Sequence, residues 1–170
     1  SASFDYIYGQ KGMLESQFDY QRASIRVEHQ QKLNRWGYFS YLVEGGKIWG
    51  TVPYTFLGIP FGNQSLLTDR ASFNMMNYLE FASDQYLTIH LEHHFEGLFF
   101  NRIPGIRVLK LREFLLAKAF AGRLSDENNG KYWTFPERLH AIEEPYVEVG
   151  FGIENILKLG RIDFTWRLNY

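Results

Sequence analysis

The sequence predicts an all-β protein: an antiparallel transmembrane β-barrel, or part of one. Apolar and polar residues alternate in steps of two along much of the 170-residue chain, as expected of strands with one apolar face. Aromatic residues make up 18 % of the chain, yet the longest apolar run is Phe114-Leu115-Leu116-Ala117. A membrane-spanning helix needs roughly 20 apolar residues. The sequence therefore predicts one barrel domain over residues 1–170, or a C-terminal barrel fragment, and excludes a spanning helix.

Composition excludes several classes of protein. The 18 Lys and Arg nearly balance the 19 Asp and Glu, for a net charge of −1, so the basic excess of a nucleic-acid binder is missing. The chain has no Cys, which excludes disulfides and thiolate metal sites. A hydrophobic content of 45 % is too high for a disordered chain.

Three strands are expected in the N-terminal third. Near the start, Phe4, Tyr6 and Tyr8 alternate with Ser3, Asp5 and Ile7. Residues 20–33 and 36–49 repeat the pattern on either side of a turn signal at Asn34-Arg35. The apolar faces of these two segments carry, in order, Ala23, Ile25, Val27, Phe39, Tyr41 and Val43.

Four more strands follow a long connection. Residues 85–96 alternate, whereas residues 111–121 are apolar on both faces apart from Arg112, Glu113 and Lys118, which leaves their facing open. Residues 146–154 and 161–170 complete the set. For these last two strands we expect a lipid-facing row of Val147, Val149, Phe151, Ile162, Phe164, Trp166 and Leu168.

The segment 73–82 decides the strand count. If it is part of a loop, there are seven strands and both long connections, 50–84 and 122–144, lie on one side of the membrane, as in outer-membrane barrels. If it is an eighth strand, the chain could close a small barrel, but the long loops would lie on opposite sides. Because single-chain bacterial barrels have even strand numbers, the seven-strand count, which we favour, predicts an incomplete barrel.

Alternation alone also fits a soluble β-sandwich. Strands of about ten residues are long for a sandwich and suit a tilted membrane strand, and the rings crowd the apolar faces as interfacial girdles would. The polar faces would then line a lumen. For that lumen we predict a polar network of His90, Glu92, His94, Glu148, Glu154, Arg161, Asp163 and Arg167.

Two parts of this network resemble chemical sites. His90, Glu92 and His94 share one face, but successive side chains about 7 Å apart on one strand make a poor metal cage. Glu148 and Glu154 could form a catalytic carboxylate pair, but we favour a lumen salt-bridge ladder with Arg161, Asp163 and Arg167, which a polar interior needs in any case. We predict no metal, no cofactor and no catalytic residue.

Several longer motifs resemble a family. The chain is similar to the C-terminal barrel, of unknown function, of a Bacteroidota outer-membrane family that carries an N-terminal carboxypeptidase-like regulatory domain and is related to the BamA-like surface-antigen superfamily. The resemblance rests on GKIWGTVPY (46–54), IPFGNQS (59–65), FNMMNYLEF (73–81), LEHHF (91–95), NRIP (101–104), YVEVG (146–150) and GIENI (152–156).

The resemblance implies further expectations. Members of that family are longer, with a signal peptide and a periplasmic domain, and we expect one more strand after Tyr170. The apolar loop 50–72 should fold into the lumen or against a partner. The related superfamily locks this loop with a Val-Arg-Gly-aromatic tip, for which the nearest substitute here is Gly62-Asn63-Gln64-Ser65. That departure argues against an insertase activity.

The expected function is an outer-membrane scaffold that assists protein or lipid assembly or transport. Its expected partners are outer-membrane lipid, other outer-membrane or periplasmic proteins, or the missing part of the barrel, and no nucleic acid. Two alternatives stay open: an outer-membrane enzyme using His90, Glu92 and Glu148, and a soluble ligand-binding barrel with an apolar interior.

Overall fold

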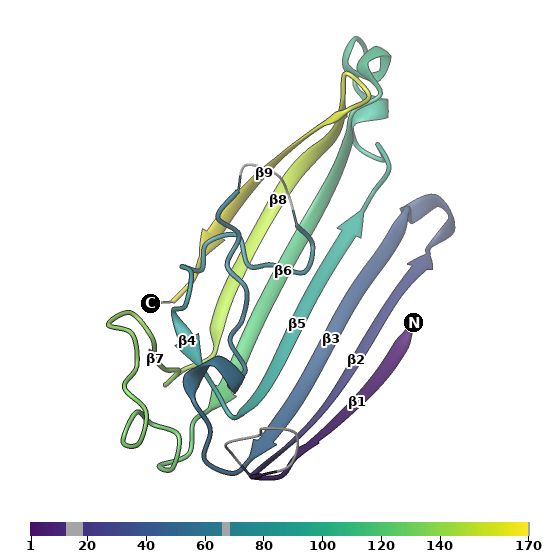
Figure 1. The fold of residues 1–170 in the computed structure, drawn as a ribbon. Helices are drawn as coiled ribbons and strands as arrows, with labels where there is room; N and C mark the ends of the chain where they lie inside the picture. The colour runs from purple at the N-terminus through teal and green to yellow at the C-terminus, as the bar shows by residue number, and fades with distance from the viewer. Residues whose placement is uncertain (13–18, 66–68, 170) are drawn as a thin grey trace.

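Seven strands form one continuous antiparallel sheet in a computed structural model that describes residues 1–12, 19–65 and 69–169. Each long strand pairs with the next long strand along the chain (Figure 1). The strands are β1 (Ala2–Gly9), β2 (Tyr20–Lys32), β3 (Tyr38–Trp49), β5 (Gln85–His94), β6 (Arg112–Arg123), β8 (Tyr146–Ile156) and β9 (Gly160–Arg167). The predicted antiparallel all-β fold is confirmed, with strand bounds close to those expected from alternation.

In the described part of the connections, all helices and strands are short. Strand β4 (Phe81–Ala82) pairs in parallel with β7 (His140–Ala141). Four 3-10 helices are η1 (Asn34–Trp36), η2 (Tyr54–Phe56), η3 (Phe100–Arg102) and η4 (Ile106–Leu109). Across the described ranges, no helix has the length and apolar character needed to span a membrane.

The segment 73–82 is part of a loop, as the seven-strand count requires. Only Phe81 and Ala82 of this segment are in a strand. The long connections 50–84 and 124–145 begin and end at the same end of the sheet, because Lys47 pairs with Gln85 and Gln85 pairs with Arg123. We call this the long-connection end. The opposite short-turn end holds η1, η3, η4 and the β8–β9 turn.

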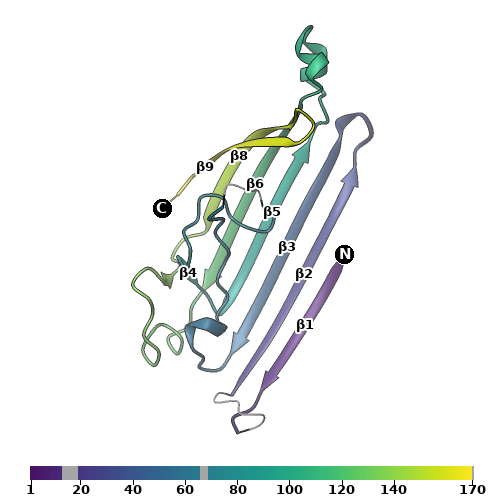
Figure 2. The same cartoon turned by 45° about the horizontal axis from the view of Figure 1, so that its top comes forward.

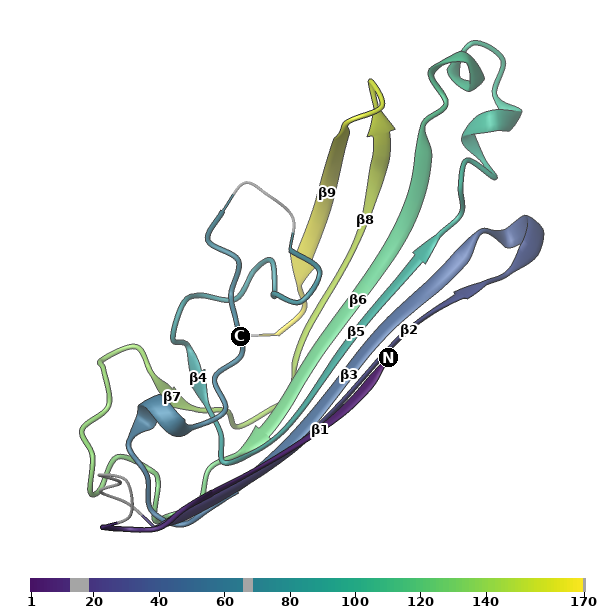
Figure 3. The same ribbon diagram turned by 45° about the vertical axis from the view of Figure 1, so that its right-hand side comes forward.

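The sheet is a curved wall with two free edges. Strand β1 pairs with β2 and strand β9 with β8, and no pairing among the described residues joins β1 to β9 (Figure 2). Both edges therefore present unpaired backbone groups. Figure 3 shows the curvature, with the 50–84 connection, β4 and β7 on the concave side.

The convex face is apolar and exposed. Directly paired residues share a face, so Phe4, Ile25, Gly45 and Leu87 form one row across four strands. Large apolar side chains that are 44–68 % exposed on this face are Phe4, Tyr6, Tyr8, Ile25, Leu87, Leu115, Phe151, Ile162, Phe164, Trp166 and Leu168. The hydrophobic core is not on this side of the sheet.

The core lies between the concave face and the 50–84 connection. One cluster packs Phe73, Met76 and Phe81 of the connection against Phe120 of β6 and Tyr146 of β8, together with Ile142. A second cluster joins Ile48 of β3 to Val52, Leu57, Ala82 and Leu139. The apolar loop therefore lies on the concave side of the sheet, and that this side is a lumen stays a prediction.

Glycines on β8 allow close packing. A Cβ on Gly152 would lie 2.5 Å from the carbonyl oxygen of Ile162 and would overlap the Phe114 ring. A Cβ on Gly150 would lie 2.5 Å from the Phe164 carbonyl oxygen. A close approach of the neighbouring backbone is therefore present at both positions. It is absent at Gly45, where a Cβ would be 3.6 Å from its nearest neighbour, an ordinary contact.

Candidate functional site

The concave face carries a polar network that binds the 50–84 connection to the sheet. Strand pairing aligns His90, Lys118, Glu148 and Arg167 in one row across β5, β6, β8 and β9. All eight residues of the predicted network lie on this face, on β5, β8 and β9. That this face lines a lumen stays a prediction.

Glu148 is the most completely bonded carboxylate of the network. Its side chain is fully buried. One carboxylate oxygen accepts the Asn74 N–H at 2.8 Å, and the other accepts the Met75 N–H at 3.0 Å. The Tyr146 hydroxyl donates to the same group at 2.9 Å. This β8 carboxylate therefore fixes the middle of the connection through backbone groups.

Lys118 supplies the neighbouring positive charge. Its Nζ lies 4.0 Å from Glu148 Oε1, and its side chain is 1 % exposed. The same Nζ donates to the Ser72 carbonyl oxygen and contacts the Asn74 side-chain oxygen at 3.5 Å. Because a buried charge is costly unless it is paired and hydrogen-bonded, Lys118 and Glu148 each depend on the other and on the connection.

Arg167 forms a second anchor at the end of β9. Its guanidinium donates to both carboxylate oxygens of Glu80, at 2.5 and 3.3 Å, and lies 4.9 Å from the centre of the Tyr146 ring. Burial alone would raise the pKa of Glu80. The hydrogen bonds and charge of Arg167, with the Asn77 N–H, outweigh burial and hold this pKa below its ordinary value.

His94 lies between two carboxylates. Its Nε2 is 3.0 Å from Glu92 and its Nδ1 is 3.1 Å from Glu154. The ring is fully buried and stacks on Tyr38 with centroids 4.3 Å apart. Because ionised carboxylates only accept hydrogen bonds, the imidazolium form, which donates from both nitrogens, satisfies both contacts.

Arg161 joins this group from β9. It donates to Glu92 at 3.1 Å and to Asp163 at 2.7 and 2.9 Å. Its guanidinium lies 3.9 Å from the centre of the Phe114 ring. Three strands, β5, β8 and β9, therefore contribute to one ionic cluster.

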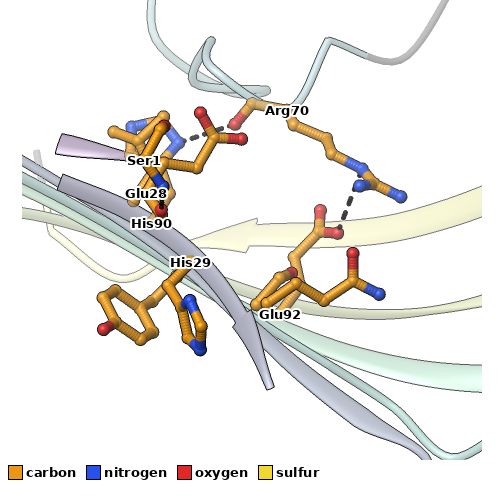
Figure 4. A pocket seen from close by; sticks show the side chains of 10 residues that line it. Ser1, Glu28, His29, Arg70, His90 and Glu92 are labelled. Atoms are coloured by element: carbon orange, nitrogen blue, oxygen red, sulfur yellow. Dashed lines mark hydrogen bonds and ion pairs between the residues drawn. The ribbon is translucent and has the colours of Figure 1, made fainter. Parts of the chain in front are cut away.

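Arg70 links the connection to this cluster. The Arg70 carbonyl oxygen accepts a hydrogen bond of 2.8 Å from His90 Nδ1, and the Arg70 guanidinium is 3.7 Å from Glu92 (Figure 4). Both contacts lie at a cavity of about 320 Å³ on the concave side, which Glu28 and His29 of β2 also line.

The charges of the network balance. Around His94, the carboxylates of Glu92, Glu154 and Asp163 face Arg161, Arg70 and the imidazolium. In the other half of the network, the carboxylates of Glu148 and Glu80 are paired with Lys118 and Arg167. Within residues 1–12, 19–65 and 69–169, no three His, Cys, Asp or Glu side chains are placed to hold a metal ion. The arrangement is suited to holding the connection on the sheet.

Comparison with known proteins assigns a family. Residues 2–135, more than half of the chain, match the model of the C-terminal domain of a family of unknown function, DUF5686. The chain belongs to the DUF5686 family. The match covers β1 to β6 and part of the 124–145 connection, so the connection 50–84, His90, Glu92 and His94 lie inside it. No curated protein and no solved structure matches the chain.

One partner of each ion pair that holds the connection on the sheet was not predicted from the sequence. Lys118 stood out as a lone charge in an apolar strand, but its facing was open, and only its pairing with His90 and Glu148 places it. Arg70 and Glu80 carried no signal, because their partners on the sheet are 20 or more residues away in the sequence. The expected substitute tip, Gly62–Ser65, lies upstream of the loop residues that bind the network: Arg70, Ser72, Asn74, Met75 and Glu80.

Proposed function

We propose that the chain forms part of the wall of an outer-membrane β-barrel, with its convex face against lipid and its concave face toward the lumen. In this role it is a scaffold that assists the transport or assembly of proteins or lipids. The proposal rests mainly on one observation: the exposed apolar face and the charged network lie on opposite sides of a single sheet.

The distribution of apolar surface supports the membrane assignment. Soluble monomers rarely expose contiguous apolar patches larger than a few hundred Å², yet here apolar side chains cover the convex face from β1 to β9. A soluble ligand-binding barrel would place its apolar residues inside. The concave side carries the buried charged residues Glu92, His94, Lys118 and Glu148 beside its apolar core, while the apolar side chains of the convex face stay exposed. This combination matches the pattern of membrane barrels.

The anchored connection supports a scaffold over an enzyme. Three residues that an acid–base mechanism would use are His90, Glu92 and Glu148. His90 Nδ1 donates to the Arg70 carbonyl oxygen, Glu92 is bound by His94 and Arg161, and Glu148 accepts from the Asn74 and Met75 N–H groups. Of these three side chains, only His90 has a buried polar atom, Nε2, that makes no hydrogen bond within the described residues. We infer that these side chains hold the connection as a plug on the concave side, and that this plug controls passage along the lumen.

The free edges support an assembly with further strands. Unpaired backbone groups are not tolerated in the hydrocarbon core, so β1 and β9 each need a neighbour. We propose that the strands that pair with β1 and β9 come from the rest of the barrel or from another outer-membrane protein. The resemblance to Bacteroidota barrels related to the BamA-like superfamily supports the same arrangement.

Tryptophan quenching by brominated lipid tests this proposal. In the protein reconstituted in vesicles, a variant that retains only Trp166 reports on the convex face. A matched variant that retains only Trp133 reports on the 124–145 connection. We expect strong quenching of Trp166 and weak quenching of Trp133. Equal quenching of the two, or a protein that is monodisperse without detergent or lipid, would contradict the membrane assignment.

A further inference from the structure

The short-turn end carries a second charged surface, separate from the concave network. A depression of about 470 Å³ lies between the β5–β6 connection and the β8–β9 turn. Three cations and one acid line it, Arg107, Lys110, Arg112 and Glu96, with Asn101, Val108 and Asn155. We call these seven residues the basic cavity. With three cations and one carboxylate, the basic cavity has a net positive charge.

Most of this positive charge is uncompensated. Arg112 is 3.5 Å from Glu96. Among the described residues, no carboxylate lies within ion-pair distance of Arg107 or Lys110, and both side chains are exposed. The two walls are joined, because Asn155 Nδ2 donates to the Lys110 carbonyl oxygen at 2.7 Å. The cavity therefore has a net positive lining and two walls joined by a hydrogen bond.

Three very exposed apolar residues lie at the same end of the sheet as the basic cavity, and we call them its apolar rim. Leu159 and Leu157 are the most exposed large hydrophobic residues in the described part of the chain, at 96 % and 87 %, followed by Val108 at 76 %. The β8–β9 turn, which carries both leucines, and the η3–η4 segment lie at the same end of the sheet (Figure 1). Exposed cations and exposed apolar residues therefore share this end of the sheet.

The backbone of the β8–β9 turn adds a second observation. Leu157 has a φ of 50°, in the left-handed region, where Gly or Asn is ordinary and leucine is uncommon. Neither burial nor local conformation accounts for a leucine there.

We propose that the basic cavity binds the phosphate of an acidic phospholipid, and that Val108, Leu157 and Leu159 enter the adjoining membrane interface. This inference rests on the proposed membrane function. The rim adjoins the convex apolar face through Ile153 and Ile162, which pair directly at the base of the turn. Cations beside an apolar surface are the usual means of binding anionic leaflets.

Brominated lipids again provide the test, with the protein in vesicles. Val108→Trp, in a background whose native tryptophans are replaced by Phe, places the reporter at the basic cavity, and the Trp166-only variant reports from the convex face. At Val108→Trp we expect brominated phosphatidylglycerol to be preferred over brominated phosphatidylcholine by about fivefold, the effect of roughly one cation near the surface. At Trp166 we expect no preference.

Charge variants make the test specific. Arg107→Ser with Lys110→Ser should abolish the preference, whereas Lys131→Ser with Arg138→Ser, exposed cations at the long-connection end, should leave it unchanged. A preference that survives the first pair, or is never seen, overturns the proposal. Competition by inorganic phosphate at constant ionic strength would mean a soluble anion site and would overturn the lipid assignment.

The two proposals fail in different ways. Quenching of Trp166 without quenching of Val108→Trp would contradict the lipid site and leave the membrane barrel standing. Absence of quenching at both positions would contradict both.

Discussion

Glu148 on β8 accepts a 2.8 Å hydrogen bond from the backbone N–H of Asn74, a residue 74 positions earlier in the chain. The bond joins a fully buried carboxylate to the middle of the 50–84 connection. Lys118 approaches the same carboxylate from β6 and also binds the Ser72 carbonyl oxygen. The connection is therefore held to the sheet by a buried ion pair whose two members each bind its backbone.

Glu148→Gln should weaken this anchor. The variant leaves the Lys118 charge buried without its partner, which costs about 3–5 kcal/mol in comparable buried pairs. We expect a lower free energy of unfolding in urea and faster proteolysis within residues 69–80. Glu137→Gln, at an exposed site on the 124–145 connection, should change neither quantity.

A double variant separates the ion pair from the backbone contacts. Lys118→Met with Glu148→Gln removes both charges, so it should recover part of the stability lost in Glu148→Gln alone. Strictly additive losses in this cycle would show that the two residues act independently, contrary to the geometry.

His94→Leu should destabilise the cluster at the other end of the network. Glu92 and Glu154 would lose their shared donor, and the expected loss in the free energy of unfolding is about 3–5 kcal/mol. His29→Leu, on an exposed part of β2, is the matched control. A loss at His94 no larger than at His29 would argue against a bridging imidazolium.

The Glu80–Arg167 anchor should be sensitive to acid. The pKa of Glu80 is lower in the folded protein than its ordinary value of 4.5. Its contribution to stability is therefore complete above the unfolded-state pKa and is lost as pH falls through the folded-state pKa. The difference in Tm between wild type and Glu80→Gln should shrink as the pH falls below about 4.5. A difference that grows on acidification would contradict this assignment.

Gly152→Ala should be far more harmful than Gly45→Ala. A Cβ at Gly152 meets the Ile162 carbonyl oxygen and the Phe114 ring, whereas a Cβ at Gly45 has ordinary room. We expect a loss of about 1–3 kcal/mol at Gly152 and a small change at Gly45, measured by urea unfolding. Equal losses of stability in the two variants would mean that the β-propensity of the residue, and not the contacts of the added Cβ, sets the change in the free energy of unfolding.

Alternation predicted the strands well because it reflects a property of each strand by itself. The two-residue period of a strand places Phe164 and Trp166 on the apolar face of the sheet. The same period places Glu148 and Arg161 on the opposite, polar face. The predicted boundaries lie close to the observed ones because turn signals such as Asn34-Arg35 interrupt the alternation between β2 and β3.

The anchors could not be predicted in the same way. Glu148 and Arg161 were expected to form a ladder between adjacent strands. In the structure Arg161 reaches Glu92 on β5, and Glu148 binds Asn74 in the connection. These partners depend on the path of residues 50–84 across the concave face. That path is set by packing of side chains such as Phe73 and Phe81, which follows no local period.

The facing of β9 gives the most direct test of the central claim. The chain has no Cys, so single-cysteine variants at Ile162, Asp163, Phe164 and Thr165 can each carry one nitroxide spin label in the reconstituted protein. We predict high accessibility to oxygen in the bilayer at Ile162 and Phe164, and low accessibility at Asp163 and Thr165. A profile without this two-residue period, or with its phase reversed, would contradict a lipid-facing convex surface.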